Sequence, residues 1–545
     1  MLSISVGNQS LDITDDISIT LKFQSPLFND LGDYSFPFKL PLTARNKIIL
    51  NWKHRIESTD DKHEFFPASV LWEGVEMFSG SLRTQKAGLY YEAVMYVDKG
   101  SFNWTIKNSM LHQVDLGSQI VPPNNLTYYN WTLAHYYPET NLCFPPVYNE
   151  DYTGVQNTSF GEDTYNFNYT SAPTGIRVVT PQGNMSIIVP MLYLRYVLNR
   201  IAQILGYNLI DDFFNKTSDL QNLIIYNSKN IVYTNPQFVQ GNMKIFYQQH
   251  VPQVTIKAFL QGLENYFNCR FFVNDLTKSI TIKSALDIMA KPLAIPFSLG
   301  VSELTLLIAD QLTGSIMTIK GDDSDSVFTQ VTDSDAEYLK IVSGSVQTLS
   351  DLTVLPMSAI ITNEDVYYVI DVDAYYIATW NGTTNVMDWN VYQNNLSPAT
   401  INLYRYQSAN ISKIESDFSC LYESAPGTGV ACGNLKTDWK TITPRLMIAK
   451  IYLTMRAVTQ SSSMDLKLGG SSGIFKRFHQ KWEKWILDDR RNVEFKKQLT
   501  FLDIRDLDFS AKYEINGTNY LLNTVSVSIT KMDIKPAIIN AYTIF

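Results

Sequence analysis

The sequence has few of the residues and motifs on which enzymes and metalloproteins depend. It contains 4 Cys and 6 His in 545 residues, and its histidines are never closer than nine positions. No His-Glu-x-x-His, paired-His zinc spacing or Cys-x-x-Cys occurs, and there is no Gly-x-x-x-x-Gly-Lys phosphate loop. The sequence therefore predicts no catalytic, cofactor-binding or metal-binding residue, and no cofactor.

Cysteine is also too scarce for a disulfide scaffold. Cys420 and Cys432 flank a turn-forming stretch at 425–429, so a single disulfide there is sterically reasonable. No other feature indicates an oxidising compartment, which favours free thiols.

Charge and long apolar runs are scarce as well. Charged residues make up 18% of the chain, below the usual figure of about 25%. The net charge of −9 argues against a general nucleic-acid or membrane-surface binder, which would be basic. No apolar run approaches the roughly 20 residues of a membrane span. Residues 1–7 have neither the basic nor the apolar region of a signal peptide, so we expect no leader and no span.

Aromatic residues are plentiful by contrast. The chain has 32 Tyr, 28 Phe and 9 Trp. Such rings are enriched in the cores of protein interfaces, although β-rich proteins use them heavily in any case. With 45% hydrophobic residues, the chain has enough apolar material for the three to four domains that its length suggests.

Residues 190–284 carry the clearest pattern, in which a helix is followed by a strand twice. Apolar residues recur on one helical face in each unit, and each helix ends at a residue suited to a left-handed cap, Gly206 in the first unit and Asn268 in the second. Pro190 suits the first turn of the first helix. The second unit continues as a hairpin, with strands at 269–273 and 279–283. An internal duplication and two unrelated amphipathic helices both explain this pattern.

The remaining patterns predict an α+β chain that is mainly β. We expect barrel-like β domains, a central helix–strand unit and one C-terminal amphipathic helix. The predicted segments are a β domain at 1–112, a loop-rich insertion at 113–185, the α+β domain at 186–290, a β domain at 291–460, and a helix with a β hairpin at 461–545.

The C-terminal helix, predicted at 474–488, has aromatic residues on one side and lysines elsewhere. A basic aromatic helix of this kind can lie on a membrane. Because the whole chain is acidic, packing of the aromatic side into a protein core is the favoured interpretation.

Three weak signals for chemistry remain. The stretch 469–473 matches Gly-x-Ser-x-Gly around Ser471, but His479 is the only later histidine and lies on the following helix. Aspartates cluster at 322–325 and 333–335 without the glycine and terminal glutamate of a calcium loop, which favours solvated turns. Asn-x-Ser/Thr sequons are numerous, as expected by chance in a chain rich in Asn and Thr.

Three passages together resemble a family of structural proteins from bacteriophage and prophage tails, the tail-tip or baseplate hub type. The first passage is 25–30, 34–46 and 78–83, the second is the pair of units ending at 205–207 and 267–271, and the third is 482–491, 507–510 and 515–522. The resemblance covers about half of the chain, and the matching motifs are structural rather than catalytic.

This resemblance implies a virion protein assembled in the host bacterial cytoplasm and located at the distal end of the tail tube. It implies a homo-oligomer, with a trimer favoured, in contact with tail tube, tape-measure, fibre or spike and other baseplate proteins. It implies no specific nucleic-acid partner. Some family members carry a peptidoglycan-degrading domain, for which this chain has no motif.

Two rival functions differ in class. A receptor- or carbohydrate-binding tail adhesin would use exposed rings such as Trp380, Trp389 and the Tyr-rich region 128–166 to stack on sugars. An enzyme would be a serine hydrolase at Ser471 or a cell-wall hydrolase. The hub interpretation predicts instead that the chain is not an enzyme.

Overall fold

The computed structural model describes most of the first 300 residues and the C-terminal segment. The described residues are 1–7, 9–53, 65–121, 128, 131–132, 134–145, 147–148, 164–165, 189–227, 237–239, 242–297, 300–302, 304–307, 314–317, 337–339, 346–349, 355–356, 366–369, 374–381, 386–391, 445–451, 455–458, 461, 463–464, 466, 472–486 and 490–544.

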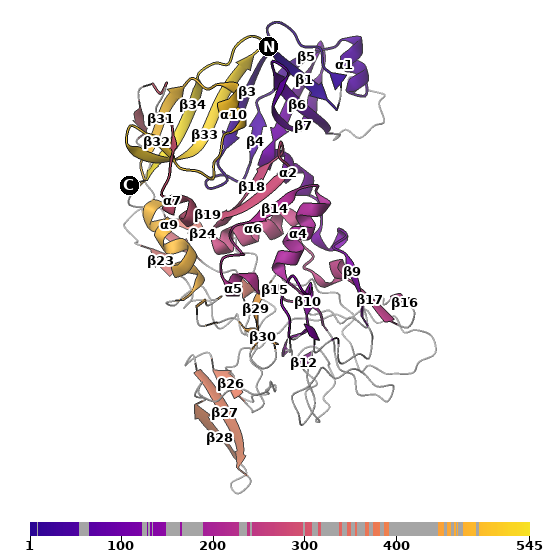
Figure 1. The fold of residues 1–545 in the computed structure, drawn as a ribbon, viewed down its shortest axis with the longest axis vertical. Helices are drawn as coiled ribbons and strands as arrows, with labels where there is room; N and C mark the ends of the chain where they lie inside the picture. Colours follow the sequence, from indigo (N-terminus) through magenta and orange to yellow (C-terminus); the bar gives the residue numbers. More distant parts are fainter. Residues whose placement is uncertain are drawn as a thin grey trace.

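The two ends of the chain together build one large sheet (Figure 1). Its strand order is β2-β1-β6-β7-β8-β4-β3-β33-β34-β31-β21, with β5 beside β8 and with β32 joining β20 to β33. The strands are β1 (Leu2–Val6), β2 (Gln9–Ser10), β3 (Ser18–Gln24), β4 (Asp33–Ser35), β5 (Phe38–Pro41), β6 (Phe66–Trp72), β7 (Val75–Ala87), β8 (Tyr90–Val97), β20 (Ile295–Pro296), β21 (Thr305–Leu307), β31 (Asn492–Lys497), β32 (Tyr513–Ile515), β33 (Thr518–Thr530) and β34 (Ala537–Ile544).

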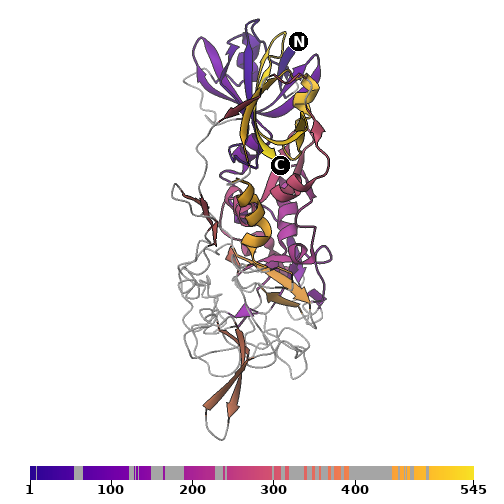
Figure 2. The same ribbon diagram turned by 90° about the vertical axis from the view of Figure 1, so that its left-hand side faces the viewer.

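The join between the two ends is the antiparallel pairing of β3 with β33, in which Lys22 lies opposite Ser526. Buried side chains alternate with partly exposed ones along both strands, so one face of the sheet forms a core shared by the predicted segments 1–112 and 461–545. Helix α10 (Phe501–Arg505) contributes Ile504 to this core. Figure 2 shows how the sheet curves. Within the described residues its end strands β2 and β21 do not pair, so the expected barrel-like shape is realised as an open sheet.

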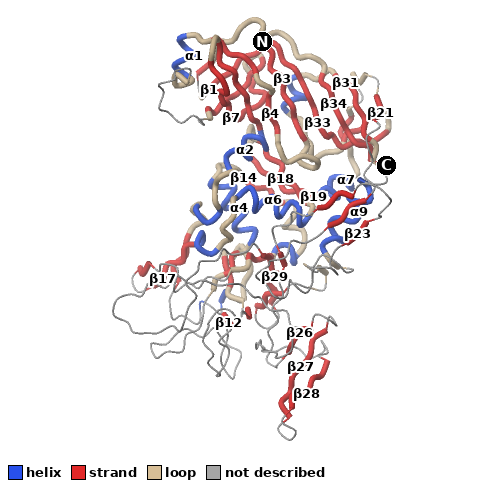
Figure 3. Tube along the Cα trace, turned by 180° about the vertical axis from the view of Figure 1, so that it is seen from behind, coloured by secondary structure: helices blue, strands red, loops and turns tan. Residues whose placement is uncertain are grey.

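The central α+β unit has a three-stranded sheet in the order β14-β19-β18 (Figure 3). Strand β14 (Asn208–Asp211) runs parallel to β19 (Ser279–Ser284), and β18 (Cys269–Asn274) pairs with β19 as the predicted hairpin. Helices α4 (Leu194–Ile204) and α6 (Ile256–Phe267) pack into one core with these strands. The caps are as predicted, since Gly206 has φ of 78° and Asn268 of 48°.

One predicted boundary is wrong. Pro190 does not belong to the first helix, because β13 (Met191–Leu192) intervenes and Tyr193 is the N-cap. Strand β13 pairs with β10 (Leu142–Cys143), so the stretch 113–185, predicted to be loop-rich, contributes buried residues to the α+β core.

Further helices surround these two bodies. They are α1 (Ala44–Ile49), α2 (Asp98–Ile106), η1 (Leu111–Gln113), α5 (Ser218–Gln221), η3 (Tyr247–His250), α7 (Ala285–Ala290), η5 (Phe475–His479) and α9 (Gln480–Lys484). Thr43 caps α1, accepting a hydrogen bond from the Asn46 amide at 3.1 Å.

The remaining strands form small sheets. They are β9 (Ser118–Val121), β11 (Val147–Tyr148), β12 (Thr164–Tyr165), β15 (Leu223–Ile225), β16 (Gln237–Val239), β17 (Asn242–Phe246), β22 (Gly314–Met317), β23 (Glu337–Leu339), β24 (Val346–Leu349), β25 (Leu355–Pro356), β26 (Val366–Val369), β27 (Ala374–Asn381), β28 (Val386–Val391), β29 (Arg445–Ile451) and β30 (Met455–Val458). The chain is thus α+β and mainly β, as predicted.

The predicted C-terminal helix is confirmed in η5 and α9. Phe475, Phe478, Trp482 and Trp485 are all buried. Trp482 and Trp485 contact Phe28, with ring centroids 5.7 and 6.3 Å apart. The aromatic side of this helix therefore packs into the protein. Among the described residues, no helix is both long and apolar enough to cross a membrane.

Candidate functional site at the junction of the large sheet and the α+β unit

Charged side chains converge where the large sheet meets the α+β unit. Helix α2 begins directly after β8 of the sheet and packs against β18 and α6 of the unit. Helix α2 therefore connects the large sheet to the α+β unit. Its first residues, Asp98 and Lys99, lie at the junction of the two.

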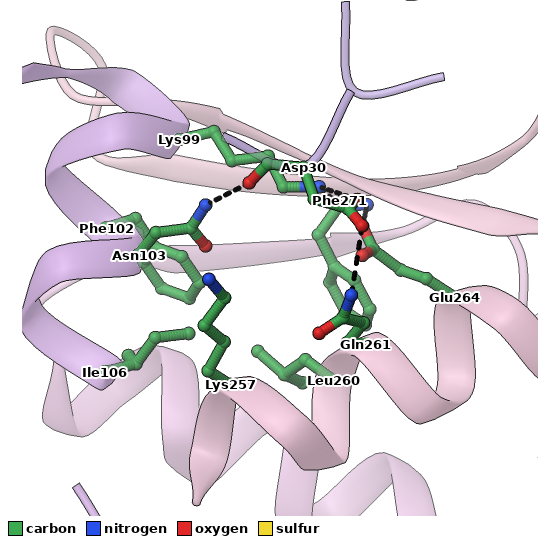
Figure 4. A pocket seen from close by; sticks show the side chains of 10 residues that line it. All are labelled: Asp30, Lys99, Phe102, Asn103, Ile106, Lys257, Leu260, Gln261, Glu264 and Phe271. Carbon is green, nitrogen blue, oxygen red and sulfur yellow. Dashed lines mark hydrogen bonds and ion pairs between the residues drawn. The ribbon is translucent and has the colours of Figure 1, made fainter. Parts of the chain in front are cut away.

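Lys99 lines one side of a small pocket (Figure 4). Its Nζ donates to Glu264 Oε1 of α6 at 2.9 Å, and both side chains are buried. Asp30, in the loop before β4, lies on the other side, with Oδ1 at 4.0 Å from the same Nζ. Lys99 therefore links α2 to both bodies.

The neighbours of the Lys99–Glu264 pair complete the pocket. Gln261 donates to Asp30 Oδ2 at 3.0 Å, and Asn103 donates to the Asp30 carbonyl at 2.7 Å. Glu264 Oε1 also accepts from the Phe271 amide at 3.0 Å. The pocket volume is about 20 Å³, room for about one water molecule. A pocket of this size, with polar groups bonded to one another, suits a packing contact between structural elements rather than a substrate-binding site.

Three carboxyl groups from different elements form a second cluster nearby. Asp33, at the start of β4, accepts from the Gln24 amide at 2.5 Å. Asp98 Oδ1 accepts from the Asp275 amide, in the β18–β19 turn, at 2.7 Å. Asp275 Oδ1 accepts from the Tyr207 hydroxyl and, at 3.0 Å, from Lys278 Nζ. Asp275 Oδ2 is buried and has no hydrogen-bond partner among the described residues.

The environment changes the protonation of two of these groups. Withdrawal from water and the neighbouring Asp98 carboxyl raise the pKa of Asp33 well above its ordinary value, although the Gln24 amide and Lys99 oppose the shift. Withdrawal from water also raises the pKa of Asp98 to about 7, and the charge of Asp275 adds to this increase. The Asp275 amide and Lys278 lower the pKa of Asp98 by a smaller amount.

A cleft of about 220 Å³ adjoins the carboxyl cluster. Asp33, Asp98 and Lys99 line one part of it, and Lys283, Asp508 and Ser510 another. Lys283 Nζ donates to Ser510 Oγ at 2.8 Å, and Ser510 N donates to Asp508 Oδ1 at 2.7 Å. The cleft lies between β19 of the α+β unit and the C-terminal segment of the large sheet, and it gives water access to Asp33 and Asp98.

Backbone contact brings the two bodies close together. A Cβ atom on Gly100 of α2 would lie 2.0 Å from the Asp33 carbonyl oxygen, and one on Gly32 would lie 2.3 Å from the Gly100 nitrogen. Gly32 also has φ of 78°. Only glycine permits both the approach and the conformation.

This arrangement offers carboxyl and ammonium groups but no assembled nucleophile. Among the described residues, no group of three or more His, Cys, Asp or Glu side chains is placed to hold a metal ion. Cys143 and Cys269 are free and buried, and burial raises the pKa of both thiols, which disfavours the reactive thiolate.

The candidate hydrolase histidine lies away from this junction, in the core. His479 is buried, its Nε2 lies 2.9 Å from the Tyr266 carbonyl oxygen, and burial lowers its pKa to about 4. Ser471, the aspartate clusters at 322–325 and 333–335, Cys420 and Cys432 lie outside the described residues.

Other sequence candidates are placed only by strand register. In the sheet β26-β27-β28, Trp380 lies opposite Met387, and Trp389 lies opposite Ala378. Among the Asn-x-Ser/Thr sequons, Asn516 has φ of 52° in the turn between β32 and β33, and Asn381 is the last residue of β27.

The junction residues were not predicted from the sequence. For Glu264, a signal was present, because it follows Ile256 and Leu260 at helical spacing and so falls on the buried face of α6. A charged residue at such a position predicts a buried partner. No comparable local signal marks Asp33, Asp98 or Asp275.

Comparison with known proteins gives similarity at the level of structure alone. No protein-family model matches the chain, and no curated protein matches it. The chain is similar to the 43 kDa tail protein of prophage MuSo2 from Shewanella oneidensis, with 9% identity and a TM-score of 0.35, over 99% of this chain and 96% of that one. It is also similar to a tail protein from Neisseria meningitidis MC58, with 8% identity and a TM-score of 0.33, over 99% and 95% of the respective chains. At these identities the similarity assigns no role to individual residues.

Proposed function

We propose that the chain is a structural protein of a phage tail that acts by assembly, as a hub or adaptor at the distal end of the tail tube. The observation that carries the proposal is the large sheet, which the two ends of the chain build jointly and in which, among the described strands, both edges are open. Open edges offer backbone groups to strands of neighbouring subunits. The motifs at 25–46, 205–207 and 515–522 support the tail assignment through their resemblance to hub proteins.

Side chains at one edge favour such contacts. Strand β21 pairs only with β31 among the described strands, and Leu304 and Leu306 are exposed there. At the opposite edge, both residues of β2 are exposed. The proposal therefore includes a closed homo-oligomer, with a trimer favoured, and contacts to tail tube, tape-measure, fibre or spike and baseplate proteins in the virion. The five predicted segments remain the proposed division of the sequence, with the first and the last joined in the large sheet.

Light scattering across protein concentration tests the assembly. We expect a closed oligomer for the wild type and a smaller mass for Leu306→Asp, because the charge would be buried at the edge. Leu89→Asp is the control, since Leu89 is 89% exposed in the β7–β8 turn. Electron microscopy of phage particles, labelled with an antibody to this chain, tests the location. Label along the tail or on the head would contradict the distal position.

A tail adhesin that binds receptors or carbohydrate is the second candidate. The antiparallel sheet β26-β27-β28 carries Trp380 and Trp389 on neighbouring strands, and aromatic rings bind sugars by stacking. Glycan binding by the wild type that is lost in Trp380→Ala and Trp389→Ala would favour this function over the hub.

A further inference from the structure

The cluster of Asp33, Asp98 and Asp275 suggests a function beyond the proposed role in assembly. These residues come from β4, the start of α2 and the β18–β19 turn, so the cluster spans the large sheet and the α+β unit. We propose that the contact between these two bodies depends on protonation. The three carboxyl groups together hold at least one proton, and the contact between the large sheet and the α+β unit weakens when all three are ionised.

The negative charges of the cluster are only partly balanced. Lys99 pairs with Glu264 at 2.9 Å, so its charge is shared between Glu264 and the neighbouring Asp33. Lys278 pairs with Asp275 at 3.0 Å, but its side chain is 57% exposed and its charge is screened by water. Three carboxylates would thus have one solvated ammonium group of their own and part of the charge of Lys99.

The hydrogen bonds of the cluster are incomplete when all three carboxyl groups are ionised. Asp275 Oδ2 is buried without a partner among the described residues, and a buried acceptor without a donor is unfavourable. A proton on the cluster supplies the missing donor and removes one negative charge. No covalent bond changes in this step, and water in the cleft supplies or accepts the proton.

The other charged groups near the cluster are engaged elsewhere. Lys283 is bound to Ser510, and Arg505 to Asp506 at 2.8 Å. Asp508, which accepts from the Ser510 amide, adds a further negative charge to the cleft wall. Asp30 interacts with Gln261 and lies on the far side of Lys99.

The sign of the pH effect follows from the direction of the shifts. Asp98 has its pKa raised to about 7 in the folded protein, and Asp33 is raised in the same direction. A carboxyl group with a raised folded-state pKa binds its proton more tightly in the folded state. The stabilisation is therefore present at low pH and is lost as pH rises to about 7, by up to about tenfold in the folding equilibrium constant per pH unit and per group.

The test compares Asp98→Asn with the wild type in full-length protein. Asparagine keeps an oxygen for the Asp275 amide but cannot ionise. We expect the wild-type folding equilibrium constant to fall between pH 5 and pH 8, and Asp98→Asn to lose at least tenfold less over the same range. Asp15→Asn is the control, because Asp15 is 95% exposed and precedes β3, whereas the cluster lies beyond the other end of that strand. Equal pH dependence in Asp98→Asn and wild type would overturn the proposal.

Two measurements on the wild type do not depend on the variant's folding. An infrared carbonyl band of a neutral carboxyl group should be present at pH 6 and disappear by pH 9. Hydrogen-exchange protection of the Gln24 and Asp275 amides, which donate to Asp33 and Asp98, should fall over the same range after correction for intrinsic exchange. Absence of the band at pH 6 would overturn the proposal without affecting the proposed tail function.

Discussion

Lys99 and Glu264 form a buried ion pair, with Lys99 Nζ 2.9 Å from Glu264 Oε1 and side chains only 7% and 6% exposed. The partners belong to α2 and α6, which are separated by 165 positions in the sequence. The pair therefore reports directly on whether α2 has docked onto the α+β unit.

Removing one partner of this pair should be strongly destabilising. Lys99→Met leaves the Glu264 carboxylate buried without its cation. Glu264→Gln leaves the Lys99 ammonium group buried without the Glu264 carboxylate. For either variant we expect a loss of about 3–5 kcal/mol in the free energy of unfolding, measured by urea titration. The double variant should lose less than the sum of the two, and strict additivity would show that the groups do not interact.

The backbone contact of Gly100 gives a second prediction. Because a Cβ atom there would lie 2.0 Å from the Asp33 carbonyl oxygen, Gly100→Ala must move α2 away from β4. We expect a destabilisation of about 1–3 kcal/mol in thermal or urea unfolding. Gly88→Ala is the matched control, since no atom lies within 4 Å of its Cβ position and its φ is ordinary. Equal effects of the two substitutions would contradict the close approach.

Asn268 has two roles: it ends α6 in a left-handed conformation, and it binds the C-terminal helix through its side chain. It has φ of 48° at the end of α6, and its Nδ2 donates to the Phe478 carbonyl oxygen at 2.9 Å. In Asn268→Ala, the free energy of unfolding should fall by about 1–2 kcal/mol because alanine disfavours the left-handed backbone conformation, and by about 1 kcal/mol because the hydrogen bond is lost. Asn268→Gly should lose only the second amount. Urea unfolding of both variants checks this order, and a glycine variant less stable than the alanine variant would refute it.

His479 makes the stability sensitive to acid. Burial lowers its pKa to about 4 from an ordinary value of 6.5, so the folded protein prefers the neutral ring. The stabilisation is complete above pH 6.5 and is lost as pH falls towards 4, by up to about tenfold in the folding equilibrium constant per pH unit. His479→Gln retains a donor for the Tyr266 carbonyl and cannot be protonated, so its unfolding free energy should fall less between pH 7 and pH 4.5. Parallel curves for the two proteins would contradict this role.

Local patterns in the sequence predicted the α+β unit well. The spacing of apolar residues located α4 and α6, and the residues Gly206 and Asn268 located their ends, because both signals depend on neighbours within a few positions. Pro190 misled the prediction of the helix start, since proline also suits the extended stretch that precedes β13.

Contacts between distant residues could not be predicted in the same way. The hydroxyls of Thr20 and Ser528 lie 2.8 Å apart although 508 positions separate them, and the alternation in β3 and β33 does not indicate which strand is the partner. The junction also depends on contacts between residues that are distant in the sequence. Asp33, Asp98 and Asp275 have no common spacing, and only the folded chain brings them together.

The C-terminal helix distinguishes packing in the core from binding to a membrane. Trp485 is 4% exposed, and its Nε1 donates to the Thr543 carbonyl oxygen of β34 at 3.1 Å. Trp485→Ala should lower the free energy of unfolding by about 3–5 kcal/mol, measured by urea titration.

Lys481 and Lys484 lie on the exposed side of the same helix and provide the contrasting variants. Substituting both by Glu should change stability by no more than about 0.5 kcal/mol, because surface positions of this kind contribute little. Vesicles of anionic phospholipid should not carry the wild-type protein upward in a flotation gradient. Flotation that is abolished by the Lys481→Glu and Lys484→Glu pair would show that the helix leaves the core and binds the membrane, because cationic side chains on the polar face drive such binding.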